Sequence, residues 1–389
     1  MRVIVIGAGV FGAWTALWLR RRGAQVTLVD AYGPGNSLAS SGGETRITRS
    51  AHGRDHHYPL WQRRAREHWL DLEKATGQHL FVPSGVLWFA YREDGFEADS
   101  LSTLERLGIP VERWPADQLL LRYPQITGND LTWALFEPEG GALLARRGVA
   151  TACAAFATDG GELRIGLARA PSRADGSGDE LHRLRLADGG DLTADAFVFA
   201  CGPWLPALFP NLVNLAVTRQ EVVFIAPAPG DARLDAANLP TWVDFDRSFY
   251  GVGSVEGRGF KLAPDWPGPA VDPDRQDRRL TDPFVDASRQ YLRLRFADLA
   301  ERPVAEGRVC QYEATPDAHF IADTHPEWKN VWIVGGGSGH GFKHGPSMGE
   351  HVSGLVMTGT SEVAPPDGRF RLGARQPGGA LRTAAAPAP

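Results

Sequence analysis

The feature that most constrains this chain is a glycine-rich turn between an apolar run and a helix pattern near its start. Residues 2–6 are mostly apolar, and residues 7–12 carry glycine at their first, third and sixth positions. A helix pattern covers about 11–22, and a second apolar run covers 24–29. This strand–turn–helix–strand order predicts the beginning of a Rossmann-like α/β domain that binds a dinucleotide.

Each glycine of the turn has its own physical role. Gly7 permits the tight turn, Gly9 lets the backbone approach a pyrophosphate, and Gly12 lets helix and strand pack closely. The first helical residues, Val10 and Phe11, lie where the positive end of the helix dipole faces the phosphates. We therefore predict that these five residues bind the cofactor.

An acidic residue stands at the distance that this motif requires. Asp30 follows Gly12 by 18 residues and ends the second strand. A carboxylate there accepts hydrogen bonds from the adenosine ribose and disfavours a ribose phosphate. The alternative is a glycine-rich turn in an unrelated α/β protein, and the flanking strand and helix weigh against it. The motif alone does not distinguish FAD from NAD.

Further elements of the same kind are predicted in the middle and near the end of the chain. Helices are expected over 58–75, 146–158 and 347–359, and buried strands over 194–200 and 331–334. The segments between them read as β-rich. The sequence thus predicts a discontinuous cofactor-binding domain, a substrate domain and a disordered tail, with boundaries at 1–85, 145–215 and 305–375 for the first, 86–144 and 216–304 for the second, and 376–389 for the tail.

Composition and charge exclude several classes of partner. The 389 residues carry a formal net charge of −5 and no basic stripe, which argues against nucleic acid. No apolar run has the roughly 20 residues needed to span a membrane, and the first residues read as strand and turn rather than as a signal peptide. Cys153, Cys201 and Cys310 are too widely spaced for a disulfide framework or a metal site. We predict a cytoplasmic protein without a metal.

Several segments together carry a resemblance to a known family. They are Gly-Glu-Thr-Arg-Ile-Thr-Arg at 43–49, Phe-Tyr-Gly at 249–251 with Gly-Phe-Lys at 259–261, the stretch 309–321, and Ser-Gly-His-Gly-Phe-Lys at 338–343. They resemble monomeric sarcosine oxidase and its relatives, including N-methyltryptophan oxidase, within the D-amino-acid-oxidase-like flavoproteins. The resemblance extends over about residues 1–360, and its last segment is the most specific.

The resemblance implies both a fold and a reaction. The fold is of the α/β class, with a Rossmann-like FAD-binding domain and a mixed β-sheet substrate domain that covers the flavin. The implied enzyme is an FAD-dependent amine oxidase that converts a C–N bond of a secondary amine or amino acid to an imine. Dioxygen then takes up the electrons and becomes hydrogen peroxide. The implied state is a monomer whose partners are the small amine substrate and dioxygen.

The resemblance assigns attachment and reoxidation of the flavin to two residues. Cys310 matches the cysteine that links covalently to FAD, which requires a positioned thiolate. The alternative, a small buried hydrophobe, fits Cys153 and Cys201. Lys261 matches the catalytic lysine that lies over the flavin and activates dioxygen, because a fixed cation stabilises the charge that dioxygen acquires. The alternative for Lys261 is a solvated lysine at a strand end.

A second group of residues is implied to contact the substrate and the flavin ring. Arg49 and Lys343 match a pair that holds a substrate carboxylate, through a bidentate fork and a point charge. Arg46, with Thr45, matches residues beside the flavin ring. The cation of Arg46, which is implied to be catalytic, favours reduced, anionic flavin there, and Thr45 is implied to bind the cofactor. Tyr250 matches an active-site tyrosine that contacts the substrate, although a half-buried strand aromatic is nearly as compatible. Surface ion pairing is the alternative for the two arginines.

Loop residues complete the implied cofactor site. His340, within the last loop, is interpreted as a histidine that satisfies backbone groups. Gly339 is implied to contact the substrate as well as the cofactor. The full set of loop residues implied to bind FAD is Ser41, Gly202, Gly337, Gly339, Gly341, Phe342 and Lys343.

The chain departs from the family pattern in two places. Sarcosine-specific members have a histidine four residues after the oxygen-activating lysine, whereas this chain has Asp265. The loop before Thr45 contains Ser41 and Gly42 where the family often has paired histidines. The first departure bears on the substrate, and the second bears on the flavin environment and the efficiency of covalent attachment.

Asp265 predicts a substrate other than sarcosine. A carboxylate near the flavin face favours a substrate with a positive group distinct from the reacting nitrogen. Trp266 and Trp242 suggest that this substrate is larger and aromatic. The alternative is that Asp265 only caps the turn at Pro264 and points to solvent.

Two other functions fit the same sequence. One is a dehydrogenase of the same fold that passes electrons to an acceptor other than dioxygen, and Lys261 argues against it. The other is a flavin-carrying subunit of a larger oxidase complex. The complete set Arg49, Tyr250, Lys261 and Lys343 argues against that reading.

Overall fold

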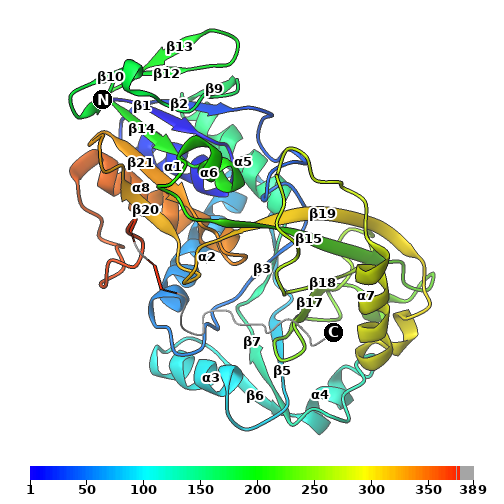
Figure 1. Ribbon diagram of the computed structural model, residues 1–389. Coiled ribbons are helices and arrows are strands. Elements are labelled where there is room, and N and C mark those ends of the chain that lie inside the picture. Colours follow the sequence, from blue (N-terminus) through cyan, green and yellow to red (C-terminus); the bar gives the residue numbers. More distant parts are fainter. Residues whose placement is uncertain (374, 377–389) are drawn as a thin grey trace.

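Two large sheets organise the chain, whose computed structural model describes residues 1–373 and 375–376 (Figure 1). The six-stranded sheet has the order β20-β21-β14-β1-β2-β9. The eight-stranded sheet has the order β19-β15-β18-β17-β16-β5-β7-β6. The predicted fold class, a Rossmann-like α/β domain joined to a mixed sheet, is confirmed.

The six-stranded sheet gathers segments from the start, middle and end of the chain. Its strands pair in parallel except for the antiparallel β20 and β21. Its strands are β1 (Arg2–Ile6), β2 (Gln25–Asp30), β9 (Glu162–Ile165), β14 (Ala196–Phe199), β20 (Ile321–Thr324) and β21 (Val331–Gly335). The helices that pack beside it are α1 (Val10–Arg21), α2 (His57–Thr76), α5 (Ala145–Thr158) and α8 (Gly345–Thr358).

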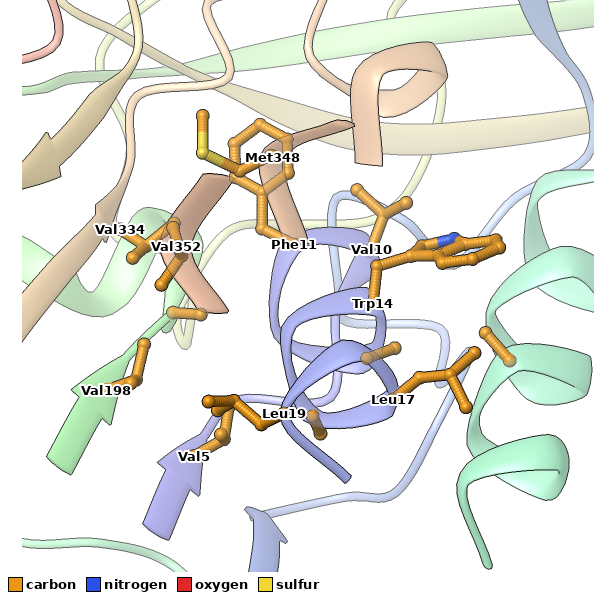
Figure 2. Packing of buried hydrophobic residues seen from close by; sticks show 14 of the residues in the cluster. Val5, Val10, Phe11, Trp14, Leu17, Leu19, Val198, Val334, Met348 and Val352 are labelled. Carbon is orange, nitrogen blue, oxygen red and sulfur yellow. The ribbon is translucent and has the colours of Figure 1, made fainter. Parts of the chain in front are cut away.

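Apolar side chains cover both faces of this sheet, which explains the continuous apolar runs in its strands. In β1, Val3 and Val5 face α1 and α8, whereas Ile4 and Ile6 face a second buried cluster. Figure 2 shows α1 beside the strands β1 and β14 and beside α8. Burial of each large apolar side chain there stabilises the fold by about 1.5–3 kcal/mol. The residues labelled in this core are Val5, Val10, Phe11, Trp14, Leu17, Leu19, Val198, Val334, Met348 and Val352.

The eight-stranded sheet is mixed because one pair of its strands, β16 and β5, is parallel. Its strands are β5 (Val86–Ala90), β6 (Glu112–Pro115), β7 (Trp133–Glu137), β15 (Ala216–Ile225), β16 (Thr241–Asp244), β17 (Phe249–Val252), β18 (Phe260–Pro264) and β19 (Val304–Ala314). One face forms a core with α4 (Ala116–Arg122) and α7 (Asp282–Arg295), while α3 (Phe96–Arg106) packs on the other face.

Smaller elements connect the two sheets or extend from them. Strands β3 (Arg46–Thr48), β8 (Gly141–Leu143) and β4 (Phe81–Val82) form a three-stranded sheet. The other strands are β10 (Gly176–Ser177), β11 (Glu180–Leu181), β12 (Arg183–Arg185) and β13 (Asp191–Thr193), and α6 (Leu205–Leu208) is a short helix.

One predicted boundary needs correction. Position 305 was expected to begin the last cofactor-domain segment, but β19 pairs with β15 along its whole length and so belongs to the eight-stranded sheet. The predicted disordered tail, 376–389, lies outside the described residues apart from residue 376. In the described part of the chain, no helix is both long and apolar enough to cross a membrane.

Candidate functional site: a flavin cavity between two sheets

A large cavity of about 590 Å³ is lined by residues of both large sheets. It reaches from Asp30 and Trp204, beside the six-stranded sheet, to Lys261 and Asp265 on the eight-stranded sheet. Its volume is in the range of small-molecule and cofactor sites. All seven loop residues predicted to bind FAD line it, namely Ser41, Gly202, Gly337, Gly339, Gly341, Phe342 and Lys343.

The glycine turn at the start of α1 fits the phosphates of a dinucleotide. Gly7 has a φ of +100°, and a Cβ there would lie 2.4 Å from the carbonyl oxygen of Ala200. Gly7, Gly9, Val10 and Phe11 line the cavity at the helix N-terminus. Backbone N–H groups and the helix dipole favour an anion at such a position. The residues present therefore fit the pyrophosphate of FAD.

Gly12 has a supporting role and does not line the cavity. A Cβ at Gly12 would lie 1.8 Å from the carbonyl oxygen of Gly7, so α1 can approach β1 only without a side chain there. Asp30 lines the cavity and also braces the turn, because its carboxylate accepts hydrogen bonds from the backbone of Ala8 at 2.7 Å and of Tyr32 and Gly33 at 2.8 Å. Part of its acceptor capacity is thus already used by the protein.

The pleat of the eight-stranded sheet brings the other predicted residues to one face. Residues two apart on a strand share a face, and so do residues directly opposite on paired strands. Gln220 on β15 is opposite Cys310 on β19. Tyr250 on β17 is opposite Ala263, which shares its face of β18 with Lys261. Cys310, Tyr250 and Lys261 therefore converge on the cavity from three strands.

Lys261 is buried in a polar contact with the loop that precedes β3. Its side chain is 3% exposed, and Nζ donates a hydrogen bond of 2.5 Å to the carbonyl oxygen of Thr45. Burial, followed by the nearby Arg46 guanidinium, lowers the pKa of Lys261 well below its usual value. Thr45 itself lines a separate, smaller cavity beside Lys261 rather than the main one. It therefore adjoins the predicted flavin site without lining it.

Arg46 connects this loop to the predicted attachment cysteine. Its Nη2 donates to the carbonyl oxygen of Ser40 at 2.6 Å and lies 3.8 Å from the Sγ of Cys310. Its Nη1 donates to the carbonyl oxygen of Gly43 at 2.9 Å. Arg46 is thus held by backbone carbonyls in a position to stabilise negative charge on the sulfur or on a cofactor in the cavity.

Arg49 and Lys343 line the same cavity although they lie far apart in the sequence. Both are buried, at 6% and 2% exposed. Arg49 lies over the ring of Trp88 at 5.0 Å and donates to the carbonyl oxygen of Ala51. Lys343 donates from Nζ to the carbonyl oxygen of His340 at 3.0 Å. Two buried cations at one cavity favour an anionic ligand group.

Three buried histidines lie beside these cations. His52, His340 and His344 each offer a ring nitrogen, and these nitrogens lie within 4.8 Å of one another. Burial first, then nearby cations that include Arg49 and Lys343, lowers the pKa of His52 and of His344 well below the usual value. A metal cation bound by these histidines would be repelled by the positive charges of Arg49 and Lys343. His340 Nε2 contacts the carbonyl oxygen of Ala318 at 2.9 Å, as expected for a histidine that satisfies the backbone.

Asp265 lies in the cavity and not in solvent. It is 8% exposed, and its Oδ1 is 3.5 Å from the hydroxyl of Tyr312, which is itself 3.5 Å from the hydroxyl of Tyr250. The alternative in which Asp265 only caps a solvent-exposed turn is therefore wrong. Phe245 and Trp88 line the cavity as well, so its wall combines aromatic and acidic groups.

The expected aromatic contribution of Trp242 and Trp266 is wrong. Trp242 is fully buried in the core of the eight-stranded sheet, stacked on Tyr291 with ring centroids 5.4 Å apart. Trp266 packs edge-on against Phe249 at 5.1 Å. Neither lines the cavity. Successive side chains of β16 point to opposite faces of the sheet. Trp242 therefore points into the core, whereas its neighbour Val243 faces the cavity.

Sequence reasoning missed one partly buried carboxyl group in the site. Glu313 lines the cavity, its Oε2 accepts a hydrogen bond of 3.0 Å from the hydroxyl of Ser40, and burial raises its pKa to about 7. Its carboxyl group therefore changes charge near neutral pH. A signal was available, because Glu313 is three residues after Cys310 in the segment that carries the family resemblance.

The chain is similar to curated proteins over most of its length. The chain is 31% identical over 376 residues to monomeric sarcosine oxidase from Bacillus sp. (strain B-0618), covering 92% of this chain and 93% of that protein. It is 26% identical over 371 residues to N-methyl-L-tryptophan oxidase from Salmonella dublin, covering 92% and 95%. The relation to sarcosine oxidase and N-methyltryptophan oxidase predicted from the sequence is confirmed.

Solved structures share the fold at lower sequence identity. Fructosyl peptide oxidase from E. terrenum has a TM-score of 0.83 at 22% identity, covering 98% of this chain and 93% of that one. L-proline dehydrogenase from P. horikoshii has a TM-score of 0.81 at 18% identity, covering 93% and 94%. A family model described as FAD dependent oxidoreductase (DAO) matches residues 2–355. This chain therefore belongs to the DAO family of FAD-dependent oxidoreductases.

Proposed function

We propose that this enzyme is an amine oxidase that converts a C–N bond of a carboxylate-bearing secondary amine or amino acid to an imine and reduces dioxygen to hydrogen peroxide. The observation that carries the proposal is the combination, in one cavity, of the glycine cradle with buried Lys261 and the buried pair Arg49 and Lys343. Bound FAD supplies the chemistry by accepting two electrons from the amine and passing them to dioxygen.

The chain's own residues have separate tasks in this proposal. Arg49 and Lys343 hold the substrate carboxylate and so orient the reacting carbon in the cavity. Lys261 supplies the fixed positive charge that dioxygen needs when it first takes up an electron. The phenol of Tyr250 and the carboxylate of Asp265 contact the rest of the substrate. Cys310 anchors the cofactor covalently. We further propose that the enzyme is a cytoplasmic monomer.

The rival function is a dehydrogenase, since the shared fold includes a proline dehydrogenase and fold alone does not decide the electron acceptor. The test begins with an anaerobic screen of amines for bleaching of the flavin. Admission of dioxygen should then restore the colour within seconds and release one hydrogen peroxide for each amine oxidised. Slow recolouring in air together with fast recolouring by an artificial dye would identify a dehydrogenase.

Replacing Arg49 or Lys343 with alanine should weaken carboxylate binding. Loss of one charge-assisted hydrogen bond costs about 1.5–3 kcal/mol, or roughly 10–150-fold in affinity. The measurement is the dissociation constant of a simple carboxylic acid, followed through the flavin absorbance. Lys329→Ala removes an exposed lysine paired with Asp179 and Glu180 and is the matched control.

The same two variants should have little effect on an amine that lacks the acid group. Equal losses for acid-bearing and acid-free amines would instead assign Arg49 and Lys343 to the fold or to the flavin. A normal melting temperature for both variants separates these two structural roles.

Asp265 should set the preference for the far end of the substrate. We expect sarcosine to be a poor substrate and an amine with a second positive group to be preferred. Asp265→Asn and Asp265→His should each shift the ratio of kcat/KM for the preferred amine over sarcosine toward sarcosine by about tenfold or more. A ratio that stays at the wild-type value in both variants would exclude Asp265 from recognition.

A further inference from the structure

Glu137, the last residue of β7, has a buried carboxylate that is enclosed by hydrogen-bond donors. The residue is 3% exposed. Its Oε2 accepts hydrogen bonds from the backbone N–H groups of Ser50 at 2.5 Å and of Ala51 at 3.2 Å. Its Oε1 accepts a hydrogen bond of 2.8 Å from the indole Nε1 of Trp88. Because each of these neighbours is a donor, they suit an ionised carboxylate and not a carboxylic acid.

The pairing of β5 with β7 explains how Trp88 reaches this carboxylate. Glu137 is directly opposite Val86, and Trp88 is two residues further along the same face of β5. Diagonal neighbours of this kind lie about 7–8 Å apart, a gap that an aromatic ring and a long carboxyl side chain can close. Trp88 lines the large cavity and Glu137 does not, so Glu137 stands behind one of the residues of the cavity wall.

The groups that Glu137 holds are the same groups that direct the side chain of Arg49. Arg49 donates to the carbonyl oxygen of Ala51, and its guanidinium lies over the ring of Trp88, 5.0 Å from the ring centroid. Ser50 is the residue that joins Arg49 to Ala51. One carboxylate therefore fixes both the backbone acceptor and the aromatic ring against which the guanidinium rests.

The charge of Glu137 also matches that of Arg49. A buried carboxylate is costly unless hydrogen bonds and a nearby cation compensate it. Burial raises the pKa of Glu137, whereas its hydrogen bonds and the nearby Arg49 oppose that rise. A neutral acceptor would satisfy the same N–H groups at a smaller cost of burial. The carboxylate is therefore better explained by a role toward the Arg49 cation than by satisfaction of the backbone alone.

We propose that Glu137 is a positioning residue for substrate recognition, which holds Arg49 in the orientation that binds the substrate carboxylate. The inference rests on the proposed function, in which Arg49 and Lys343 bind that group. Lys343 comes from the loop after β21 and has a backbone partner of its own, the carbonyl oxygen of His340. Loss of the Glu137 carboxylate should therefore weaken the contact made by Arg49 and leave that of Lys343 in place.

Glu137→Gln tests the role, because an amide has one acceptor and one donor end. Its NH₂ group must face either the backbone at Ser50 and Ala51 or the indole of Trp88, donor against donor. We expect the dissociation constant of acetate, followed through the flavin absorbance, to rise about tenfold. The kcat/KM of acid-bearing amines should fall by a similar factor, whereas that of an acid-free amine should not change.

Two further variants complete this comparison. Glu139→Gln removes an exposed carboxylate that pairs with Arg63, and as the matched control it should bind acetate like wild type. Glu137→Asp keeps the charge and the acceptors on a shorter side chain. It should show the same selective loss in smaller measure, and it replaces Glu137→Gln if that variant does not fold.

Two double variants distinguish positioning of Arg49 from general support of the fold. Trp88→Phe added to Glu137→Gln keeps a ring beneath Arg49 but removes the indole N–H, so the amide no longer faces a donor there. Acetate affinity should recover by about threefold or more. Arg49→Ala added to Glu137→Gln should bind acetate no more weakly than Arg49→Ala alone, because Glu137 acts only through Arg49.

The outcomes separate this inference from the proposed function. Additive losses in the Arg49→Ala and Glu137→Gln pair, or equal losses for acid-bearing and acid-free amines, would overturn the positioning role. Wild-type acetate affinity in Glu137→Gln, beside weakened affinity in Arg49→Ala, would overturn it as well and leave the proposed function intact. Wild-type affinity in Arg49→Ala itself would overturn the proposed role of Arg49, and the role of Glu137 would fall with it.

Discussion

Lys261→Met should slow the reaction of reduced enzyme with dioxygen by about 10²–10³-fold, the typical effect of removing one preorganised electrostatic group. Methionine keeps a similar length and apolar stem, so the change removes the charge at Nζ and its hydrogen bond to Thr45. Reduction of the flavin by the amine should continue. Stopped-flow measurement of the two half-reactions separates them, and Lys329→Met controls for loss of an exposed lysine.

The reoxidation rate should also depend on pH in a defined direction. The protonated amine of Lys261 is the active form, and burial lowers its pKa below the usual value. Raising the pH through that lowered pKa removes the cation, so the wild-type rate should fall on the alkaline side. Lys261→Met should show no such fall. Reoxidation within a few-fold of wild type in the variant would remove Lys261 from the oxygen reaction.

Cys310→Ala should abolish covalent attachment of FAD altogether. In the proposed link, Sγ would bond to a flavin carbon with loss of one hydrogen from each partner, and the two electrons released would be taken up by dioxygen. After acid precipitation, wild-type pellets should stay yellow, whereas Cys310→Ala should release all of its flavin into the supernatant. The contact of 3.8 Å between Arg46 and Sγ places a cation beside the sulfur.

Cys201→Ala is the matched control for attachment. Cys201 lines the same cavity, but its thiol donates to the carbonyl oxygen of Ile6 at 3.4 Å, on the six-stranded sheet. The flavin of the Cys201→Ala variant should stay in the pellet after acid precipitation. Flavin released equally from wild type and Cys310→Ala would show that attachment is noncovalent.

The fold could be predicted where local patterns carry it. The turn at 7–12, the helix that follows and the strands beside it each have a periodicity or a required glycine, and they form as predicted. The predicted domain boundary at 305 needed correction because β19 joins the eight-stranded sheet through long-range pairing with β15, and no local sequence pattern indicates that pairing. The prediction for Trp242 was wrong because a single residue of a strand can face either side of the sheet, and only the pairing register decides which side.

The site was predictable to the extent that its residues lie in recognisable segments. Lys261, Arg49 and Lys343 were named from such segments, and they line one cavity. His52 and His344 were missed, because they are separated by most of the chain and share no spacing that a motif could capture. Neighbours of this kind are created by tertiary packing alone.

The discontinuous six-stranded sheet has a consequence for the order of events during synthesis. Strand β14 pairs with β1 on one side and with β21 on the other, so its second edge stays open until residues 331–335 have been made. The glycine loop at 335–341 and Lys343 follow immediately and complete the cavity. A growing chain thus exposes a bare edge of β14 while residues 200–330 are being made, when pairing with other chains is a hazard. Loading of the flavin is therefore a late event, and the cofactor can stabilise this enzyme only after nearly the whole chain has emerged.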